Sequence, residues 1–453
     1  MLMWMHIVWL ALFVRVPAFL LDPLTCLVPA PCRCAPEEVR CSNLGIHTSP
    51  NFTAAQMFAS SDVRIYLNNN LITDILDDSF SSLATSNATH FEFYLNDNQI
   101  SSIEENAFSG IESEVHTIDL TNNSLTSLSS VLGKLTNLQT LLLKDNPIQS
   151  LASSAIFPLS RTVSELSFSL DNFQNWPNEL HFFRKLSKLY IDGWQKSSLP
   201  LSSFDGVEGT ITWLEITRSR LDRIPAAVCH LNSIRHLEYV SNYDTKAPIF
   251  EPCNHNLSTV HYLSLRDNNL QYFPDVLSSF TSLGFLDVSG NNIRVIESDM
   301  IPAGSPLTHV NLSGNALQRV PSAINALTNL RSLFLDNNRI TSIERFDLLN
   351  LSLLRSLDLS NNPLEYISPG TFSSQTDFDV LNLQHTKLAT IPPAVTSLSY
   401  INRLELQGTP VQCSCQMSYL RGWGLNASAI FGTCEGTGED VNDFITNFLP
   451  YCP

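Results

Sequence analysis

The eleven residues "LRSLDLSNNPL" (354–364) hold the pattern that decides the fold. Written L-x-x-L-x-L-x-x-N-x-L, the same frame occurs in "LQTLLLKDNPI" (138–148), "LTHVNLSGNAL" (307–317) and "LRSLFLDNNRI" (330–340). Places 4 and 6 alternate with places 3 and 5, so a short strand puts its leucines on one face and variable residues on the other. One such unit can bury its leucines only by stacking on its neighbours.

The frame recurs along most of the chain. A chain of 453 residues would by default form two or three domains, and only a repeat architecture makes it one. Most copies are spaced by 23 to 25 residues. The ninth place of the fifteen copies holds Asn70, Asn98, Asn123, Asn146, Asp171, Trp194, Ser219, Asn242, Asn268, Asn291, Asn315, Asn338, Asn362, Thr386 and Thr409.

The ninth-place residue lies where the chain leaves the strand and turns inward, so it must supply partners for buried backbone groups. An Asn amide offers both donors and an acceptor at that depth. We expect Asp171, Ser219, Thr386 and Thr409 to be tolerable substitutes. Trp194 offers one donor and no acceptor. We therefore predict an irregularity there, in which either the ring leaves the turn for the surface or the turn is reshaped around it.

The pattern resembles the leucine-rich repeat family over about 350 residues. The return half of each unit carries a second apolar set, either a Phe, as in "PGTFSSQ", or a Pro followed by an aliphatic pair, as in "VPSAINALTNL". The expected fold is an α/β solenoid, a horseshoe of about 15 repeats. Its parallel sheet would line the concave face, with the return segments on the convex side.

Both ends resemble the cysteine-rich caps of extracellular members of that family. The amino-terminal spacing is C-x5-C-x-C-x6-C, over Cys26, Cys32, Cys34 and Cys41. The carboxy-terminal segment "CSCQMSYLRGWGL" begins at Cys413 and is followed by Cys434 and Cys452. The resemblance implies disulfide caps, with Cys413 joined to Cys434 and Cys415 joined to Cys452. We expect a signal peptide over 1–21, caps over 22–58 and 412–453, and repeats over 59–411.

Cys229 and Cys253 lie outside both caps, at nearly the place where other units carry a Phe. Adjacent units would bring them side by side, so we expect a disulfide. The alternative is two free cysteines that act as small buried hydrophobes. A zinc site is a weak alternative for the terminal cysteines, because both close pairs are C-x-C and no paired histidines follow.

The expected setting is extracellular. Residues 1–21 hold the only long apolar run, which Arg15 interrupts, and we read it as a secretory signal peptide, with a signal anchor as the alternative. No second run of spanning length follows, which predicts no membrane span after cleavage. An even number of cysteines in a secreted chain predicts disulfides. The net charge of −17 argues against nucleic acid as a partner.

Glycosylation sequons agree with secretion. They begin at Asn51, Asn87, Asn122, Asn256, Asn311, Asn350 and Asn426. Asn311 alone occupies the fifth place of a strand, where a glycan would block the concave face.

The sequence lacks the motifs of common enzymes, including H-E-x-x-H, G-x-S-x-G, a phosphate-binding glycine loop and a kinase signature. The eleven histidines do not cluster. We therefore expect no catalytic activity, no cofactor and no metal.

Outward strand places are where a solenoid of this kind binds partners. The third place of five consecutive units holds Trp213, His236, Tyr262, Phe285 and His309, and Tyr190 stands at the fifth place one unit earlier. With strands about 4.8 Å apart, this column would run about 19 Å across the concave face. Glu215 and Glu238 would flank it. Rings at that density predict a binding surface, although aromatic residues also suit strands and stack without a ligand.

These features predict a secreted protein that binds a protein or glycan partner through its concave face, in adhesion, matrix assembly or innate immune sensing. The alternatives are a structural or enzyme-inhibitory extracellular module, or the ectodomain form of a receptor. The oligomeric state is not predicted.

Overall fold

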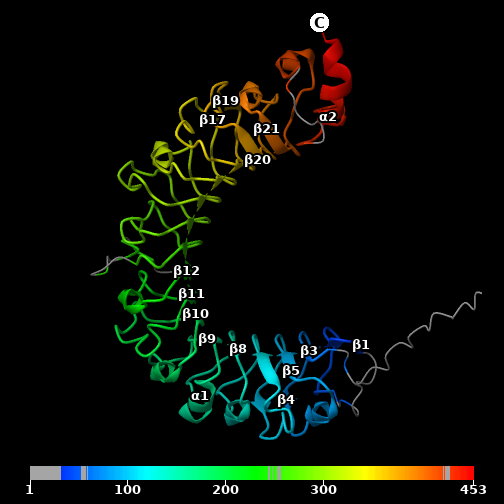
Figure 1. The fold of residues 1–453 in the computed structure, drawn as a ribbon, viewed down its shortest axis with the longest axis vertical. Coiled ribbons are helices and arrows are strands. Elements are labelled where there is room, and N and C mark those ends of the chain that lie inside the picture. The colour runs from blue at the N-terminus through cyan, green and yellow to red at the C-terminus, as the bar shows by residue number, and fades with distance from the viewer. Residues whose placement is uncertain are drawn as a thin grey trace, which may run out of the picture.

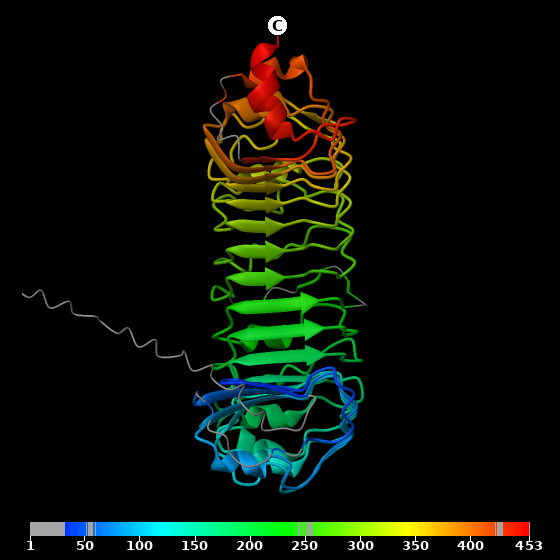
Figure 2. The same cartoon turned by 90° about the vertical axis from the view of Figure 1, so that its right-hand side faces the viewer.

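The structure, a computed structural model, describes residues 32–50, 52, 58, 60–242, 245–246, 248–250, 253, 257–421, 423 and 429–452. The chain winds as a coil whose turns stack into a horseshoe (Figure 1). Seen from the open side, the strands lie one above another like rungs (Figure 2). Within the described residues, one sheet of 18 strands lines the concave face.

Each of the fifteen repeats contributes one strand to this sheet, and successive strands are parallel. The strands of the repeats are β3 (Asp62–Tyr66), β5 (His90–Tyr94), β7 (Val115–Asp119), β8 (Thr140–Leu143), β9 (Glu165–Ser169), β10 (Lys188–Asp192), β11 (Trp213–Thr217), β12 (His236–Val240), β13 (Tyr262–Ser264), β14 (Phe285–Asp287), β15 (His309–Asn311), β16 (Ser332–Phe334), β18 (Ser356–Asp358), β20 (Asp377–Asn382) and β21 (Tyr400–Glu405). The fourth-place and sixth-place leucines Leu357 and Leu359 have no exposed surface. The predicted solenoid and its repeat number are confirmed.

The convex side consists of short and varied elements. One α-helix, α1 (Ser153–Leu159), lies outside the bend of the horseshoe (Figure 1). Two pairs of short strands also form there, β4 (Asp74–Ile75) with β6 (Ser102–Ile103) and β17 (Ser342–Ile343) with β19 (Tyr366–Ile367). The 3₁₀ segments are η1 (Ser81–Thr85), η2 (Ser130–Lys134), η3 (Asn178–Phe182), η4 (Ala226–His230), η5 (Ser322–Ala326) and η6 (Pro393–Ser397).

The two kinds of return segment fill the convex side of the core as the sequence predicts. In the first kind a single ring is buried, and Phe372 has no exposed surface. In the second kind a proline precedes the 3₁₀ segment, as Pro321 does for η5, and the aliphatic pair Ala323 and Ile324 is buried. Proline fixes the extended-to-helical corner because its φ is already near the value that the turn needs.

The ninth-place asparagines form ladders of hydrogen bonds between consecutive repeats. In Asn338 the Nδ2 donates to the carbonyls of Leu312, at 2.9 Å, and Leu335, at 3.0 Å. Its Oδ1 accepts from the backbone N–H of Leu317 at 3.0 Å. Each amide thus joins its own turn to the preceding repeat. The residue before it, Asn337, has φ of 54°, a left-handed conformation that directs the next side chain inward.

Three of the expected substitutes fill the ninth place. Ser219 is fully buried, and its hydroxyl donates to the carbonyl of Thr217 at 3.0 Å. The hydroxyls of Thr386 and Thr409 both donate to the carbonyl of Leu383, at 3.0 and 2.6 Å. A hydroxyl can donate, so it replaces part of the amide.

The expectation that Asp171 also serves this place is wrong. Asp171 is exposed, and the preceding Leu170 is fully buried. Leu170 is not among the residues with positive φ, whereas the eighth-place residue of the other fourteen repeats has positive φ. An ionised carboxylate has no proton to donate to the inward carbonyls, and a leucine resists the left-handed conformation. The turn therefore buries the leucine and leaves the carboxylate outside.

Trp194 keeps its ring inside, so the alternative in which the ring leaves for the surface is wrong. It is 1% exposed and packs edge to face on Trp176, with ring centroids 5.8 Å apart. Its Nε1 donates to the carbonyl of Ser198 at 3.0 Å. The eleventh place, usually a buried leucine or isoleucine, is the exposed Lys196. The turn after Trp194 is thus closed by the bond from its indole N–H to Ser198, with the ring in the core and the eleventh-place side chain exposed.

The sheet continues beyond the repeats at both ends of the described chain. At the amino end, β1 (Arg33–Ala35) pairs antiparallel with β2 (Glu38–Arg40), which continues the sheet to β3, and Cys32 is joined to Cys41. At the carboxy end, β22 (Ile430–Phe431) pairs with β21. The helical segments there are η7 (Cys415–Leu420), α2 (Val441–Asp443), η9 (Phe444–Phe448) and η10 (Leu449–Tyr451).

Three more disulfides lie wholly within the part of the chain that the structure describes. Cys413 is joined to Cys434 and Cys415 to Cys452, the pairs that the resemblance implies. Cys229 is joined to Cys253 between neighbouring repeats. The predicted signal peptide over 1–21, Cys26, and the sequons at Asn51, Asn256 and Asn426 lie outside the described residues. No helix among the residues that the structure describes is long and apolar enough to cross a membrane.

Candidate ligand-binding surface on the concave sheet

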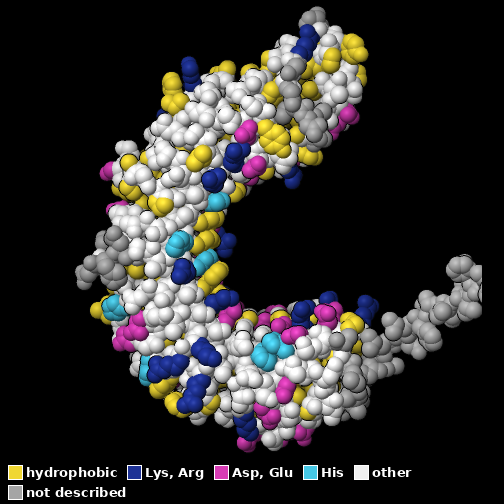
Figure 3. Space-filling model, viewed as in Figure 1, with side chains coloured by type: hydrophobic (Ala, Val, Ile, Leu, Met, Phe, Trp, Pro, Cys, Tyr) yellow, Lys and Arg dark blue, Asp and Glu magenta, His cyan; other side chains and the backbone are white. Residues whose placement is uncertain are grey.

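The predicted column of rings forms a stacked ladder because the strands that carry it are parallel and in register. Trp213 pairs with His236, His236 with Tyr262, Tyr262 with Phe285, and Phe285 with His309. The centroid distances along the ladder are 3.3, 3.9, 4.7 and 5.7 Å, with interplanar angles of 12°, 6°, 16° and 21°. We call these five rings the ring ladder. Hydrophobic and histidine side chains gather along the inner edge of the middle of the horseshoe (Figure 3).

The stacking determines which parts of the rings a ligand can meet. His236, Tyr262 and Phe285 each have another ring on both faces. All five rings are half-buried, so what they present to the concave side is mainly their edges. Within the described residues, the buried Nε1 of Trp213 has no hydrogen-bond partner. The ladder is therefore an apolar ridge of ring edges about five strands wide.

Tyr190 lies beside the ladder and is held by its own contacts. Its ring is tilted by 44° to that of Trp213, at 6.4 Å between centroids. Its hydroxyl donates to Glu165 at 3.2 Å, and the ammonium of Lys188 lies 3.2 Å from the other oxygen of the same carboxylate. Burial and the charge of Glu165 raise the pKa of Tyr190. Tyr190 thus stays a neutral hydrogen-bond donor next to Trp213.

Glu215 and Glu238 are directly opposite each other on β11 and β12. The Nε2 of His236 lies 2.6 Å from a carboxylate oxygen of Glu238, which gives that residue a partner. No hydrogen bond or ion pair to the side-chain carboxylate of Glu215 occurs among the described residues. Burial, and next the charge of Glu238, raise the pKa of the Glu215 carboxyl. The sheet thus carries a half-buried pair of like charges beside the ladder.

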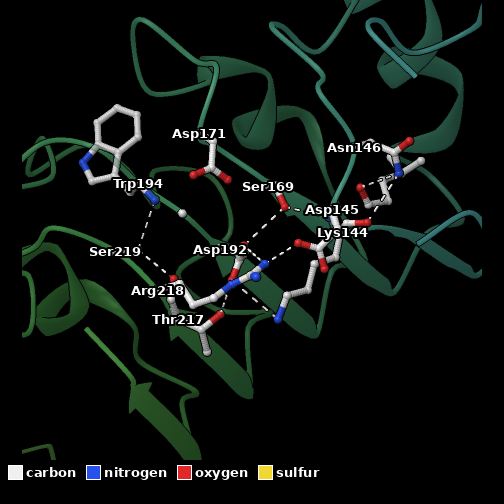
Figure 4. Close-up of polar contacts among 12 residues, drawn as sticks. Lys144, Asp145, Asn146, Ser169, Asp171, Asp192, Trp194, Thr217, Arg218 and Ser219 are labelled. Atoms are coloured by element: carbon white, nitrogen blue, oxygen red, sulfur yellow. Dashed lines mark hydrogen bonds and ion pairs between the residues drawn. The ribbon is translucent and has the colours of Figure 1, made fainter. Parts of the chain in front are cut away.

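A polar network that the sequence did not reveal lies where β10 and β11 end (Figure 4). The carboxylate of Asp192, with 1% of its side chain exposed, is held by Arg218 and lies 3.5 Å from the ammonium of Lys144. The guanidinium of Arg218 also contacts Asp145, three repeats away. The hydroxyl of Thr217 donates to Asp192 at 2.7 Å. We call Lys144, Asp145, Asp192 and Arg218 the corner network.

The charges of the corner network largely cancel one another. Burial acts to raise the pKa of Asp192, but hydrogen bonds from Arg218 and Thr217 and the charge of Lys144 outweigh it, and the pKa is lowered. The hydrogen bond with Asp192 raises the pKa of Arg218. No sequence motif signals the network, because its members are seventh-place and eighth-place residues that meet only where the solenoid bends.

A second group of rings, also missed, lies on the amino-terminal arm. The rings of Tyr66 and Tyr94 stack at 4.8 Å, and those of His90 and His116 at 3.7 Å. The Tyr94 hydroxyl donates to Glu92 at 2.8 Å, and Arg40 lies over the ring of Tyr66. Tyr66 and Tyr94 are at the fifth place of their repeats, His90 is at the first place and His116 at the second, and these positions would have been visible in the sequence. This group is short and its carboxylates are partnered, so it differs from the ring ladder.

The described sequons lie on exposed or half-exposed surface. Asn87, Asn122 and Asn350 are exposed. Asn311 is half-buried on β15, and its Oδ1 accepts from the N–H of Ser313 at 3.0 Å. It lies two residues from His309 of the ladder, as its fifth-place position predicts.

The described part of the chain holds no group of three or more His, Cys, Asp or Glu side chains placed to bind a metal ion. The polar groups of the concave face are instead paired with one another or spread along the sheet. What the arrangement can do is present a shaped apolar and acidic surface to a ligand.

Comparison with known proteins identifies the repeats. A family model described as leucine rich repeat matches residues 91–148, 286–340, 305–364, 328–388 and 352–411. The structure of a leucine-rich-repeat protein of Leptospira interrogans aligns with a TM-score of 0.59 and 21% identity, over 85% of this chain and 93% of that one. The chain is therefore built of leucine-rich repeats and has their fold, which is suited to binding proteins.

One curated relative is similar over a shorter region. A homolog of the protein phosphatase 1 regulatory inhibitor subunit of Arabidopsis thaliana is 34% identical over 105 residues, which are 22% of this chain. This region spans 31% of that protein.

Proposed function

We propose that this chain is a secreted recognition protein that binds a protein or glycan partner through the ring ladder of its concave face. Adhesion, matrix assembly and innate immune sensing are the settings that such a protein serves. The observation that carries the proposal is the ladder itself. Five half-buried rings in one unbroken stack form the kind of apolar cluster that binding hot spots use.

Secretion is supported by the cysteines. The structure has no free cysteine among the residues that it describes, and disulfides persist mainly in oxidising compartments. Of the four disulfides that it describes, one is at the amino end, one joins neighbouring repeats in the middle and two are at the carboxy end. The apolar segment over 1–21 and the exposed sequons are consistent with the same route.

The experiment is affinity capture with the full chain, expressed with its residues 1–21 in a secretory cell line and collected from the medium. We expect the capture to recover a partner. The affinity for this partner should fall more than about tenfold when Trp213 and Tyr262 are both changed to Ala, since such anchors contribute about 2 kcal/mol or more each. Tyr272→Ala is the matched control, because that ring is 77% exposed outside the ladder.

Two results would contradict the proposal. Retention of the protein in the cytosol with reactive thiols would rule out secretion. If the double variant binds the partner as tightly as the parent protein, and circular dichroism shows that its fold is unchanged, the ring ladder is not the binding surface.

Inhibition of a secreted enzyme is the second candidate function, and the likeness to a phosphatase regulatory inhibitor subunit homolog favours it. The same capture separates the two. An inhibitor would recover a hydrolase in a tight complex and suppress its activity, whereas an adhesion or matrix protein would be retained on cells or matrix.

A further inference from the structure

The ring ladder and the two glutamates beside it suggest what kind of partner the concave face takes. The inference rests on the proposed function and narrows it, because a protein segment and a glycan make different demands on rings and charges.

The geometry of the stack disfavours a glycan. Sugars bind aromatic residues by laying their C–H groups on a ring face, and the faces of His236, Tyr262 and Phe285 are covered by neighbouring rings. For these three middle rings only the edges remain for contact, and the edge of an aromatic ring carries partial positive charge. Such edges pack well against aliphatic side chains and backbone carbonyls, which a protein segment supplies.

The charges add a second and independent constraint. Glu215 and Glu238 are cross-strand neighbours, and like charges directly opposite on a sheet destabilise it. His236 hydrogen-bonds Glu238, whereas Lys144 acts on Glu215 only through its charge, because the cations of the corner network pair with other carboxylates. Arg218 pairs with Asp192 and Asp145, and Lys144 pairs with Asp192. The carboxylate of Glu215 is left without a hydrogen bond or ion pair within the described residues.

We propose that the ring ladder binds a protein segment that places a lysine or arginine side chain between Glu215 and Glu238 and lays aliphatic side chains along the ring edges. The cation removes the repulsion between the two carboxylates, and the apolar contacts supply most of the affinity. The unliganded sheet is therefore strained electrostatically at the point where the ligand binds.

This arrangement makes a prediction that needs no ligand. Glu215→Gln removes one of the two like charges, so we expect the unfolding midpoint in urea at neutral pH to rise. The matched control is Asp358→Asn, at the same fifth place of β18, because Asp358 already accepts hydrogen bonds from Ser360 and Asn382. That change should leave the midpoint unchanged or lower it.

Binding is tested with a displayed library of random peptides and an array of neutral and acidic glycans, both probed with the secreted full chain. We expect peptides enriched in Lys or Arg and in aliphatic residues, and no retained glycan. The dissociation constants of the selected peptides should rise at least about tenfold in the Glu215→Gln, Glu238→Gln double variant, because removing one partner of a buried charge pair weakens binding by that much or more in other interfaces.

The outcomes separate this inference from the proposed function. Suppose that the variant Trp213→Ala, Tyr262→Ala no longer binds the peptides but the double Gln variant still does. The ring ladder is then the binding surface, and the proposed cation between the two glutamates is wrong. If glycans are retained, if the peptides lack basic residues, if no peptide is retained, or if Glu215→Gln lowers the unfolding midpoint, the inference is overturned. If both variants bind normally, the proposed function fails with it.

Discussion

Trp194 and Asp171 occupy the ninth place of adjacent repeats, and the structure places one inside the core and the other in solvent. The tryptophan is buried against Trp176, and the lysine at the eleventh place beside it is exposed. The aspartate is excluded because the inward carbonyls need donors. The turn thus departs from the regular repeat in two ways. The tryptophan, which is large, apolar and carries an N–H donor, is buried, whereas the aspartate, whose carboxylate has no proton to donate, lies outside.

A pair of substitutions at this place tests that reading. We expect Trp194→Asn to lower the free energy of unfolding by about 2–4 kcal/mol, because a cavity replaces a large buried ring and its contact with Trp176. Asp171→Asn should change it by less than about 0.5 kcal/mol, since an exposed side chain is replaced by one of equal size. Urea unfolding of both variants gives the comparison.

The reading is wrong if Trp194→Asn is as stable as the parent protein. In that case the amide would have restored the ladder and Trp194 would contribute nothing of its own.

At the scale of elements, the strands were the most predictable part of the chain. A period of two within each strand and a fixed spacing between leucines give the strand, its inward face and its neighbours, and the structure has one strand for each of the fifteen predicted repeats. The ring ladder follows from the same register, because parallel pairing puts equal places side by side. Its residues could be named from the sequence, and stacking without a ligand was the alternative stated for them; the distances and angles of the stack needed the structure.

The corner network could not be predicted from the sequence, because it depends on contacts between non-adjacent repeats. Arg218 meets Asp145 across 73 positions of sequence, and nothing in the eleven-residue frame relates these two places. The eighth-place backbone of Leu170 was missed for a related reason. The frame treats places 7 and 8 as variable, although place 8 must adopt a left-handed conformation in every regular repeat.

For the whole molecule, the corner network accompanies a change in direction. The coil bends between the arm that carries β3–β8 and the arm that carries β11–β21, with α1 on the outside of the bend (Figure 1). An α-helix is wider than the 3₁₀ or extended return segments of other repeats, so it spreads the convex side and brings the concave ends of neighbouring strands together. Arg218 can then span three repeats on the inner side.

We expect Arg218→Ala to open this bend and so to increase the radius of gyration measured by small-angle X-ray scattering. The change removes the contacts to Asp145 and Asp192 and leaves the buried Asp192 with Lys144 as its remaining cation. Arg266→Ala is the control, because Arg266 pairs only locally with the adjacent Asp267. An unchanged radius in the Arg218 variant would show that packing alone sets the bend.

The claim that the ring ladder is the binding surface is tested most directly by hydroxyl-radical footprinting of the full chain with and without its captured partner. We predict that the oxidation rates of Trp213, Tyr262 and Phe285 fall in the complex, while those of the exposed Tyr272 and Tyr451 stay the same. Unchanged rates at the three ladder rings, together with protection of Tyr66 and Tyr94 or of the convex side, would contradict it.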